Sequence, residues 1–180
     1  FLREEVGRAM RAGFDGVYLD WIDAYEEETV VAAARRAGVE PARAMVDWLG
    51  AIRTEVRRHN PAGLVVQQNA IYLGRKDGRW VETVDAVGVE DTWYHGKPNA
   101  KWDAQSAGDL PNKAKDEFST ARRLARYAEL KAAGKPVFTI DYCRDPANAE
   151  RVYTEARRAG LVALVTRVSL ERMTTTPPPP

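Results

Sequence analysis

Residues 13–20 read GFDGVYLD, and this stretch decides the fold. Gly13 follows an amphipathic run in which Leu2, Val6 and Met10 recur at helical spacing. Glycine readily takes the left-handed backbone that closes a helix. The residues after it form a short apolar run with aromatic and branched side chains, which predicts a strand. The stretch therefore predicts a helix, a glycine turn and a strand that ends in a carboxylate.

The same order of elements recurs along the chain. Strands are predicted at 64–69, 86–91, 136–142 and 161–166, and helices from Pro41 onward, at 76–83, 113–133 and 146–159. Alternating strands and helices imply right-handed crossovers and a parallel sheet, so the predicted class is α/β. An open doubly wound sheet is the alternative. No glycine-rich phosphate loop follows any strand, which gives a phosphate-binding version little support.

Composition excludes several classes of function. Lys and Arg number 27 against 26 Asp and Glu, so charge gives no reason to expect nucleic acid or an anionic membrane as partner. No apolar run reaches the length of a membrane span. The single cysteine, Cys143, excludes an internal disulfide framework. Without a Cys/His cluster, we expect no metal and no cofactor.

The length and the two ends predict a piece of a longer protein. The 180 residues are too few for a typical closed TIM barrel of about 250. The chain begins with Phe1, inside an amphipathic pattern. We therefore expect a partial barrel domain over residues 1–172. Residues 173–180 are expected to form a Thr/Pro-rich linker or disordered tail that leads to a further domain.

Each predicted strand is apolar for most of its length and turns polar at its C-terminal end. The polar ends are Asp20, Gln68 with Asn69, Glu90 with Asp91, Asp141 with Tyr142, and Thr166 with Arg167. In parallel α/β folds these ends line the active site. The pattern predicts one polar pocket with several carboxylates.

Side-chain alternation predicts which way the acids point. Asp141 shares a strand face with Val137 and Thr139, whereas Phe138 and Ile140 lie on the other face and are expected to pack on the helices. The same reasoning places Asp20 with Tyr18, and Glu90 with the small residues of its strand. The alternative is that these acids cap helices or bind loop amides.

Two carboxylates at a fixed separation can cleave a glycosidic bond without a metal. Aromatic residues at or just after the strand ends could hold the C–H faces of sugar rings, and loop packing is the alternative for each. They are Trp21, Tyr25, Trp93, Tyr94 and Tyr142. Trp48 and Trp80 lie in helical patterns and are interpreted as packing residues. His59 and His95 are expected at the surface.

The stretch 13–20, continued by Asp23 and Tyr25, resembles the signature of the endo-α-1,4-polygalactosaminidase family. The later strand ends resemble that family in the same order, at residues 68–69, at 87–91 with Tyr94, and at 140–142. The resemblance implies a (β/α)₈ TIM barrel of which this chain carries about five βα units, strands four to eight. Trp21 and Ala70 depart from it, since a branched aliphatic residue and a glycine are expected there.

The resemblance implies hydrolysis of α-1,4-linked galactosamine polymers, outside the cell or at its surface, with Asp20 and Glu90 as the catalytic residues. We expect Asp20 as nucleophile and Glu90 as general acid/base, with carboxyls about 5–5.5 Å apart; about 6.5–9.5 Å would favour inversion. The expected substrate-binding residues are Tyr18, Asp23, Tyr25, Gln68, Asn69, Asp91, Tyr94, Asp141, Tyr142 and Arg167.

Two other functions stay open. The first is a barrel that binds glycan without cleaving it. The second is a barrel lyase or isomerase, which is less favoured because no predicted strand ends in lysine.

Overall fold

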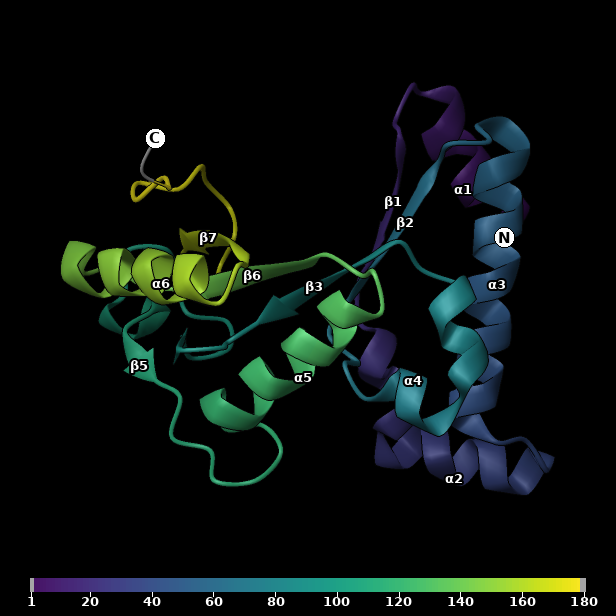
Figure 1. Cartoon of the computed structure of the whole chain (residues 1–180), viewed down its shortest axis with the longest axis horizontal. Coiled ribbons are helices and arrows are strands. Elements are labelled where there is room, and N and C mark those ends of the chain that lie inside the picture. The colour runs from purple at the N-terminus through teal and green to yellow at the C-terminus, as the bar shows by residue number, and fades with distance from the viewer. Residues whose placement is uncertain (1, 179–180) are drawn as a thin grey trace. The chain divides into compact units, whose positions relative to one another are not determined.

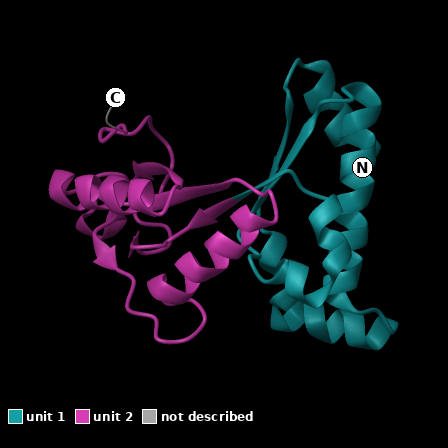
Figure 2. Ribbon diagram, viewed as in Figure 1, with its two compact units in different colours: residues 1–87 teal, residues 88–180 magenta. Residues whose placement is uncertain are grey.

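The computed structural model describes residues 2–178. The chain divides into two compact units, residues 1–87 and 88–180, and each is described by itself (Figure 2). The elements of the first unit are α1 (Leu2–Arg11), β1 (Gly16–Leu19), η1 (Ile22–Glu26), α2 (Glu28–Ala37), α3 (Pro41–His59), β2 (Leu64–Gln68), α4 (Leu73–Lys76) and η2 (Gly78–Glu82) (Figure 1). Strand β3 (Ala86–Glu90) carries the unit boundary. The second unit continues with β4 (Tyr94–His95), η3 (Gln105–Ala107), β5 (Leu110–Pro111), α5 (Thr120–Ala132), β6 (Val137–Tyr142), α6 (Pro146–Arg158) and β7 (Val162–Thr166).

The main strands confirm the predicted α/β class. Their order is β1-β2-β3-β6-β7. In the first unit β1 pairs in parallel with β2, with Gly16 opposite Leu64. In the second, β6 pairs in parallel with β7, with Phe138 opposite Val162. The loop after β3 holds a short antiparallel pair that was not predicted, β4 with β5.

Local sequence explains where the helices begin and end. Helix α3 starts at Pro41, and the Glu40 side chain accepts the backbone N–H groups of Ala42 and Arg43, at 3.1 and 2.6 Å. Proline suits this first position because its missing N–H would have no helical partner. The predicted helix-ending glycines have the expected left-handed backbone, with φ of 92° at Gly13 and 76° at Gly134.

The core of the first unit lies under α3. Its buried stripe includes Val46, Leu49, Ile52 and Val56. Trp48 lies outside this stripe and is 40% exposed, so its predicted packing role is wrong. Helix α2 was not predicted. None of its residues is buried, so no core-facing stripe marks it in the sequence.

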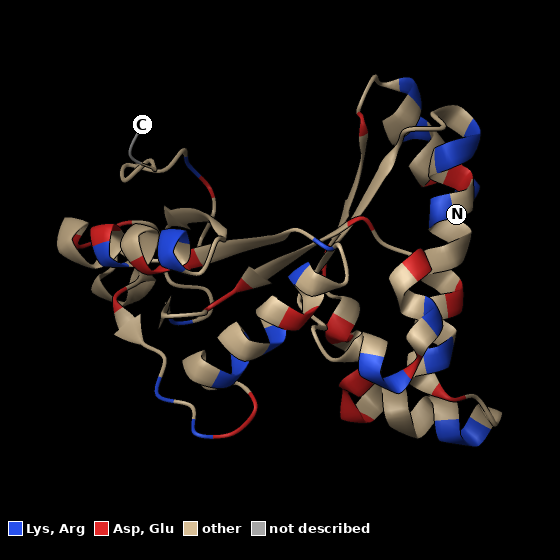
Figure 3. Ribbon diagram, in the orientation of Figure 1, with Lys and Arg blue, Asp and Glu red and all other residues tan. Residues whose placement is uncertain are grey.

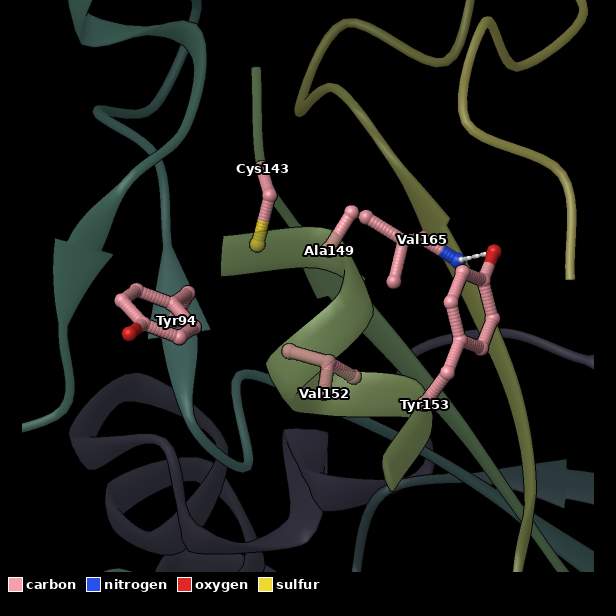
Figure 4. Packing of buried hydrophobic residues seen from close by; sticks show 6 residues of the cluster. All are labelled: Tyr94, Cys143, Ala149, Val152, Tyr153 and Val165. Carbon is pink, nitrogen blue, oxygen red and sulfur yellow. Dashed lines mark hydrogen bonds between the residues drawn. The ribbon is translucent and has the colours of Figure 1, made fainter. Parts of the chain in front are cut away.

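The second unit has its own buried cluster between α6 and β7 (Figure 4). The Tyr153 hydroxyl accepts the Val165 N–H at 3.0 Å and donates to the Thr176 carbonyl at 2.6 Å. The Thr174 hydroxyl donates to the Val165 carbonyl. Residues 174–176 of the expected linker are therefore hydrogen-bonded to this unit, because the end of β7 and Tyr153 offer them partners.

The face prediction for β6 is wrong. Val137, Thr139 and Asp141 are the buried set, whereas Phe138 is 39% exposed. Helix α5 contacts β6 on the buried side. The strand pair β6–β7 thus has one covered face and one open face, and Val162 on the open face is 63% exposed.

Both units carry basic and acidic residues (Figure 3), and the net charge of the whole chain is +1. Figure 3 shows basic and acidic residues interspersed along α3 and α6. Arg53 and Asp85 form an ion pair at 2.9 Å in the first unit. Within residues 2–178, no helix combines the length and apolarity that a membrane span needs.

Candidate active site

The structure gathers the predicted site residues in two groups, one in each unit. The first group lies where β1 and β2 end. Leu19, the last residue of β1, pairs with Gln67, so Asp20 follows at the same edge as Gln68. Asp20 is exposed. The Trp21 N–H donates to Gln68 Oε1 at 3.0 Å, which ties the two strand ends together.

The backbone at these strand ends is unusual. Trp21, Asn69 and Ala70 have positive φ angles of 57°, 54° and 50°, although none is glycine. A left-handed conformation costs an L-residue about 1–2 kcal/mol. Gln67 offsets part of this cost, since its Nε2 donates to the carbonyls of Asn69 and Ala70 at 2.8 and 3.3 Å. Strained backbone of this kind is typical of functional sites.

Gln67 links the strand end to the core of the first unit. It is fully buried, and its Oε1 accepts the Trp80 indole N–H at 2.6 Å. Trp80 is 3% exposed, which confirms its predicted packing role. Gln67 therefore does not face a ligand, although it belongs to the polar strand end.

We expect Gln67→Leu to lower the free energy of unfolding by about 1–3 kcal/mol, because it leaves a buried indole N–H and two carbonyls without partners. Urea unfolding measures the change. Trp80→Phe removes only the indole donor and serves as the matched variant. If the two side chains are coupled, the double variant should lose less unfolding free energy than the sum of the two single losses. Losses that simply add would contradict the coupling.

The second group lies where β3 and β6 end. The Tyr142 hydroxyl donates a hydrogen bond to Glu90 Oε1. Arg123 Nη1 donates to the Glu90 carbonyl at 2.5 Å. Tyr142 alternates with Phe138 and Ile140 on β6, but unlike Phe138 it is buried, at 4% exposed. The hydrogen bond from buried Tyr142 thus fixes the Glu90 carboxylate, and Glu90 is half-buried.

Asp141 has a different environment from the one expected. It is completely buried, so it does not face a ligand in solution. Its Oδ1 accepts the backbone N–H groups of Trp93 and Tyr94, at 2.6 and 2.8 Å. Its Oδ2 has no hydrogen-bond partner in the described part of the chain. We therefore assign Asp141 to holding the loop after β3, the alternative that the sequence left open.

Burial dominates the electrostatics beside Glu90. It raises the pKa of Asp141 to about 7, although the two loop N–H groups act in the opposite direction. Burial, followed by the neighbouring Glu90 carboxylate, raises the pKa of Asp91 to about 6. Two acids in this group therefore titrate near neutral pH, as is common at active sites.

We expect Tyr142→Phe to lower kcat by about tenfold, because it removes a hydrogen bond to a charged group while keeping the ring in place. Steady-state kinetics on the polysaccharide substrate proposed below measures the change. Tyr153→Phe is the matched control, since Tyr153 is bonded to backbone only. An unchanged kcat in Tyr142→Phe would show that the hydroxyl does not assist Glu90.

Besides Asp141 and Tyr142, which are 0% and 4% exposed, three predicted substrate-binding residues pack within the protein. Tyr25 is 4% exposed, and Tyr94 at 8% belongs to the buried cluster of the second unit (Figure 4). Arg167 lies 4.9 Å from the centre of the Trp102 ring and donates to the Trp102 carbonyl at 2.8 Å. Loop packing, the stated alternative for the tyrosines, is what the structure shows.

The other predicted residues remain at the strand ends. Tyr18 is 50% exposed. Asp23, Gln68, Asn69 and Asp91 are partly buried. His59 was expected at the surface, but its side chain is 17% exposed and lies 3.3 Å from Glu55.

Comparison with known proteins identifies the family. The family model described as glycoside-hydrolase family GH114 matches residues 1–178. The chain belongs to family GH114. This confirms the family predicted from the strand-end motifs. An uncharacterized protein of Deinococcus radiodurans is 34% identical over 169 residues, and one of Thermotoga maritima is 30% identical over 175 residues.

The two matches cover 94% and 91% of this chain, respectively. The chain spans only 48% of the length of each relative. Among solved structures, it resembles the glycoside hydrolase domain of PelA from Pseudomonas aeruginosa, with a TM-score of 0.67 and 21% identity. A variant of that domain gives a TM-score of 0.65 at 19% identity. Each match covers 97% of this chain and 61% of that domain, and supports the fold alone.

Sequence reasoning missed two residues of this GH114 site, Asn112 and Arg123. Asn112 Nδ2 donates to the carbonyls of Asp91 and Thr92, at 3.2 and 3.3 Å, and so fixes the loop after β3. Arg123 lies inside a helix, and Asn112 lies in a loop far along the chain from the strand ends. Neither position carries a strand-end signal. Trp21 was predicted as an aromatic residue at a strand end, but its positive φ has no sequence signature.

The donor set of the GH114 chain gives no support for a bound metal. Over residues 2–178, His, Cys, Asp and Glu side chains nowhere gather in groups of three suited to a metal ion.

Proposed function

We propose that this chain carries the working carboxylates of a glycosidase that cleaves α-1,4-linked, galactosamine-containing polysaccharide. Membership of GH114 supports the class of reaction. The likeness to the PelA glycoside hydrolase domain supports the fold on which it takes place. The observation that carries the proposal is the hydrogen bond from the buried Tyr142 to the half-buried Glu90 carboxylate at a strand end.

The proposed mechanism uses two acids. Glu90 protonates the glycosidic oxygen as the bond to the leaving sugar breaks, and Asp20 attacks the anomeric carbon. This leaves the remaining sugar covalently bound to Asp20. Glu90 then takes a proton from water, which attacks the anomeric carbon and breaks the bond to Asp20. The configuration at the anomeric carbon is retained because it is inverted twice. Asp91 and Asp23 add negative charge that favours a cationic amino sugar.

The proposed setting is a (β/α)₈ barrel. The five strands β1, β2, β3, β6 and β7 would be its strands four to eight. The 61% coverage of the PelA domain agrees with a partial barrel. The open sheet faces, which expose Tyr18 in the first unit and Val162 in the second, would then face the barrel interior. We place the enzyme outside the cell or at its surface, where such polysaccharides occur.

A reducing-end assay tests the proposed function. The chain is incubated with an α-1,4-linked galactosamine polymer, and new reducing ends are measured over time. We expect reducing ends to accumulate with this polymer, and none with an anionic α-1,4-galacturonan of similar length. Binding of the polymer without new reducing ends would instead support the non-catalytic glycan-binding function.

A further inference from the structure

We propose that Trp21 is a platform for one sugar ring of the substrate, at the position next to Asp20. The inference rests on the proposed function and deepens it, because it names the residue that sets preference at that position. Nothing in the two-carboxylate mechanism requires an aromatic side chain there.

The exposure of Trp21 is the first observation. Its side chain is 64% exposed, while Ile22 and Tyr25 directly after it are 1% and 4% exposed. Helix η1 is therefore anchored by Ile22 and Tyr25, and Trp21 is turned away from that core. An exposed indole of this size presents a large apolar face beside the exposed carboxylate of Asp20. Aromatic faces of this kind suit the C–H face of a sugar ring.

The second observation is that the backbone of Trp21 is held on both sides. Its N–H donates to Gln68 Oε1 at 3.0 Å, and its carbonyl accepts the Ala24 N–H at 3.2 Å. The residue is thus fixed between the end of β1 and the start of η1 before any ligand binds. A backbone that is already fixed loses less freedom on binding, which favours affinity.

The third observation is that the backbone conformation does not suit tryptophan. Trp21 has φ of 57° and ψ of 41°, and it occupies the N-cap position of η1 without a side-chain cap. Asparagine or glycine would fit this left-handed position better, and asparagine would also cap the helix. Folding by itself would therefore favour a different residue, so we attribute the indole to ligand binding.

This mismatch separates binding from folding in one experiment. Trp21→Asn removes the platform and suits the backbone, whereas Trp21→Phe keeps an aromatic face. For Trp21→Asn we expect KM on the galactosamine polymer to rise about tenfold. Its kcat should change by less than about twofold, because the platform binds ground state and transition state alike. The melting temperature should stay the same or rise. Trp21→Phe should keep most of the affinity.

A second readout does not depend on turnover. A galactosamine oligomer is titrated against the chain while acrylamide quenching of tryptophan fluorescence is followed. Trp21 is more exposed than Trp48, at 64% against 40%, so acrylamide reaches its indole readily. The oligomer should protect the signal that is lost in Trp21→Phe, and it should bind Trp21→Asn about tenfold more weakly.

The outcomes are distinguishable. A Trp21→Asn variant with unchanged KM and unchanged oligomer affinity overturns the platform and leaves the proposed hydrolysis intact. Trp21-dependent binding by a chain that never forms reducing ends supports the platform and overturns the hydrolase. A Trp21→Asn variant that loses stability along with affinity also overturns the inference, since the indole would then be a folding residue.

Discussion

Glu90→Gln is expected to lower kcat on the galactosamine polymer by about 10²–10⁴-fold, which is the usual contribution of a general acid/base. Glutamine keeps the length and shape of the side chain, and its amide can still accept the hydrogen bond from Tyr142. It cannot, however, give a proton to the leaving oxygen. The loss should therefore fall on kcat, with KM and the melting temperature close to those of the wild type.

Asp20→Asn should lose activity to a similar degree, because asparagine is a poor nucleophile. Glu150→Gln on α6 is the matched control, since Glu150 is exposed and lies outside the proposed site. It should leave kcat unchanged. If Glu90→Gln and Asp20→Asn both keep wild-type kcat, the two-carboxylate mechanism is wrong for this chain.

Asp141→Asn is expected to change how stability depends on pH. Burial raises the pKa of Asp141 to about 7 in the folded protein, above the value near 3.8 for a free side chain. The folded state therefore binds the proton more tightly than the unfolded chain. The stabilising contribution is complete below about pH 4 and is lost as pH rises through about 7. Asp91, whose pKa is raised to about 6, acts in the same direction.

Asparagine resembles the neutral acid, since its oxygen can still accept the Trp93 and Tyr94 N–H groups. We expect the wild type and Asp141→Asn to have similar unfolding free energies near pH 4.5. Near pH 8 the variant should be more stable by about 2–4 kcal/mol, because no buried charge forms. Urea midpoints at four pH values between these limits measure the difference. Parallel stability curves would mean that Asp141 does not ionise in this range.

The groups around Asp141 explain why its charge is poorly compensated. Asp91 adds negative charge, and Arg123 of α5 partly offsets it. Tyr127 and Cys143 lie close enough for Asp141 to affect them, but both are neutral near pH 7. Asp141→Ala separates charge from hydrogen bonding, because it leaves the two loop N–H groups without an acceptor. That variant should be destabilised at pH 4.5 and at pH 8 alike.

The positions of the site residues in the chain were predictable from local signals. Each strand ends at a change from apolar to polar residues, and a helix-ending glycine precedes β1, β6 and β7. These signals located β1, β2, β3, β6 and β7 to within about two residues. They also located Asp20 and Glu90 at strand ends, and their order along the chain gave the family.

Which side of a strand is covered was not predictable from one strand alone. Alternation fixed that Asp141 and Phe138 lie on opposite faces, but only the packing of α5 decides which face is buried. The sequence pattern placed the large apolar side chains against the helices. The loop after β3 reverses this on β6, because its two N–H groups need a buried acceptor and Asp141 supplies it.

The sequence by itself determined the α/β order, the strand ends and the family, because these depend on periodicity, helix caps and short motifs that neighbouring residues carry. Only the tertiary structure decided which polar side chains face a ligand and which hold the loops. That choice depends on contacts between residues far apart in the chain, such as Trp21 with Gln68 and Glu90 with Tyr142. Hydrogen bonds of this kind form only once the strands are paired, so a linear pattern does not reveal them.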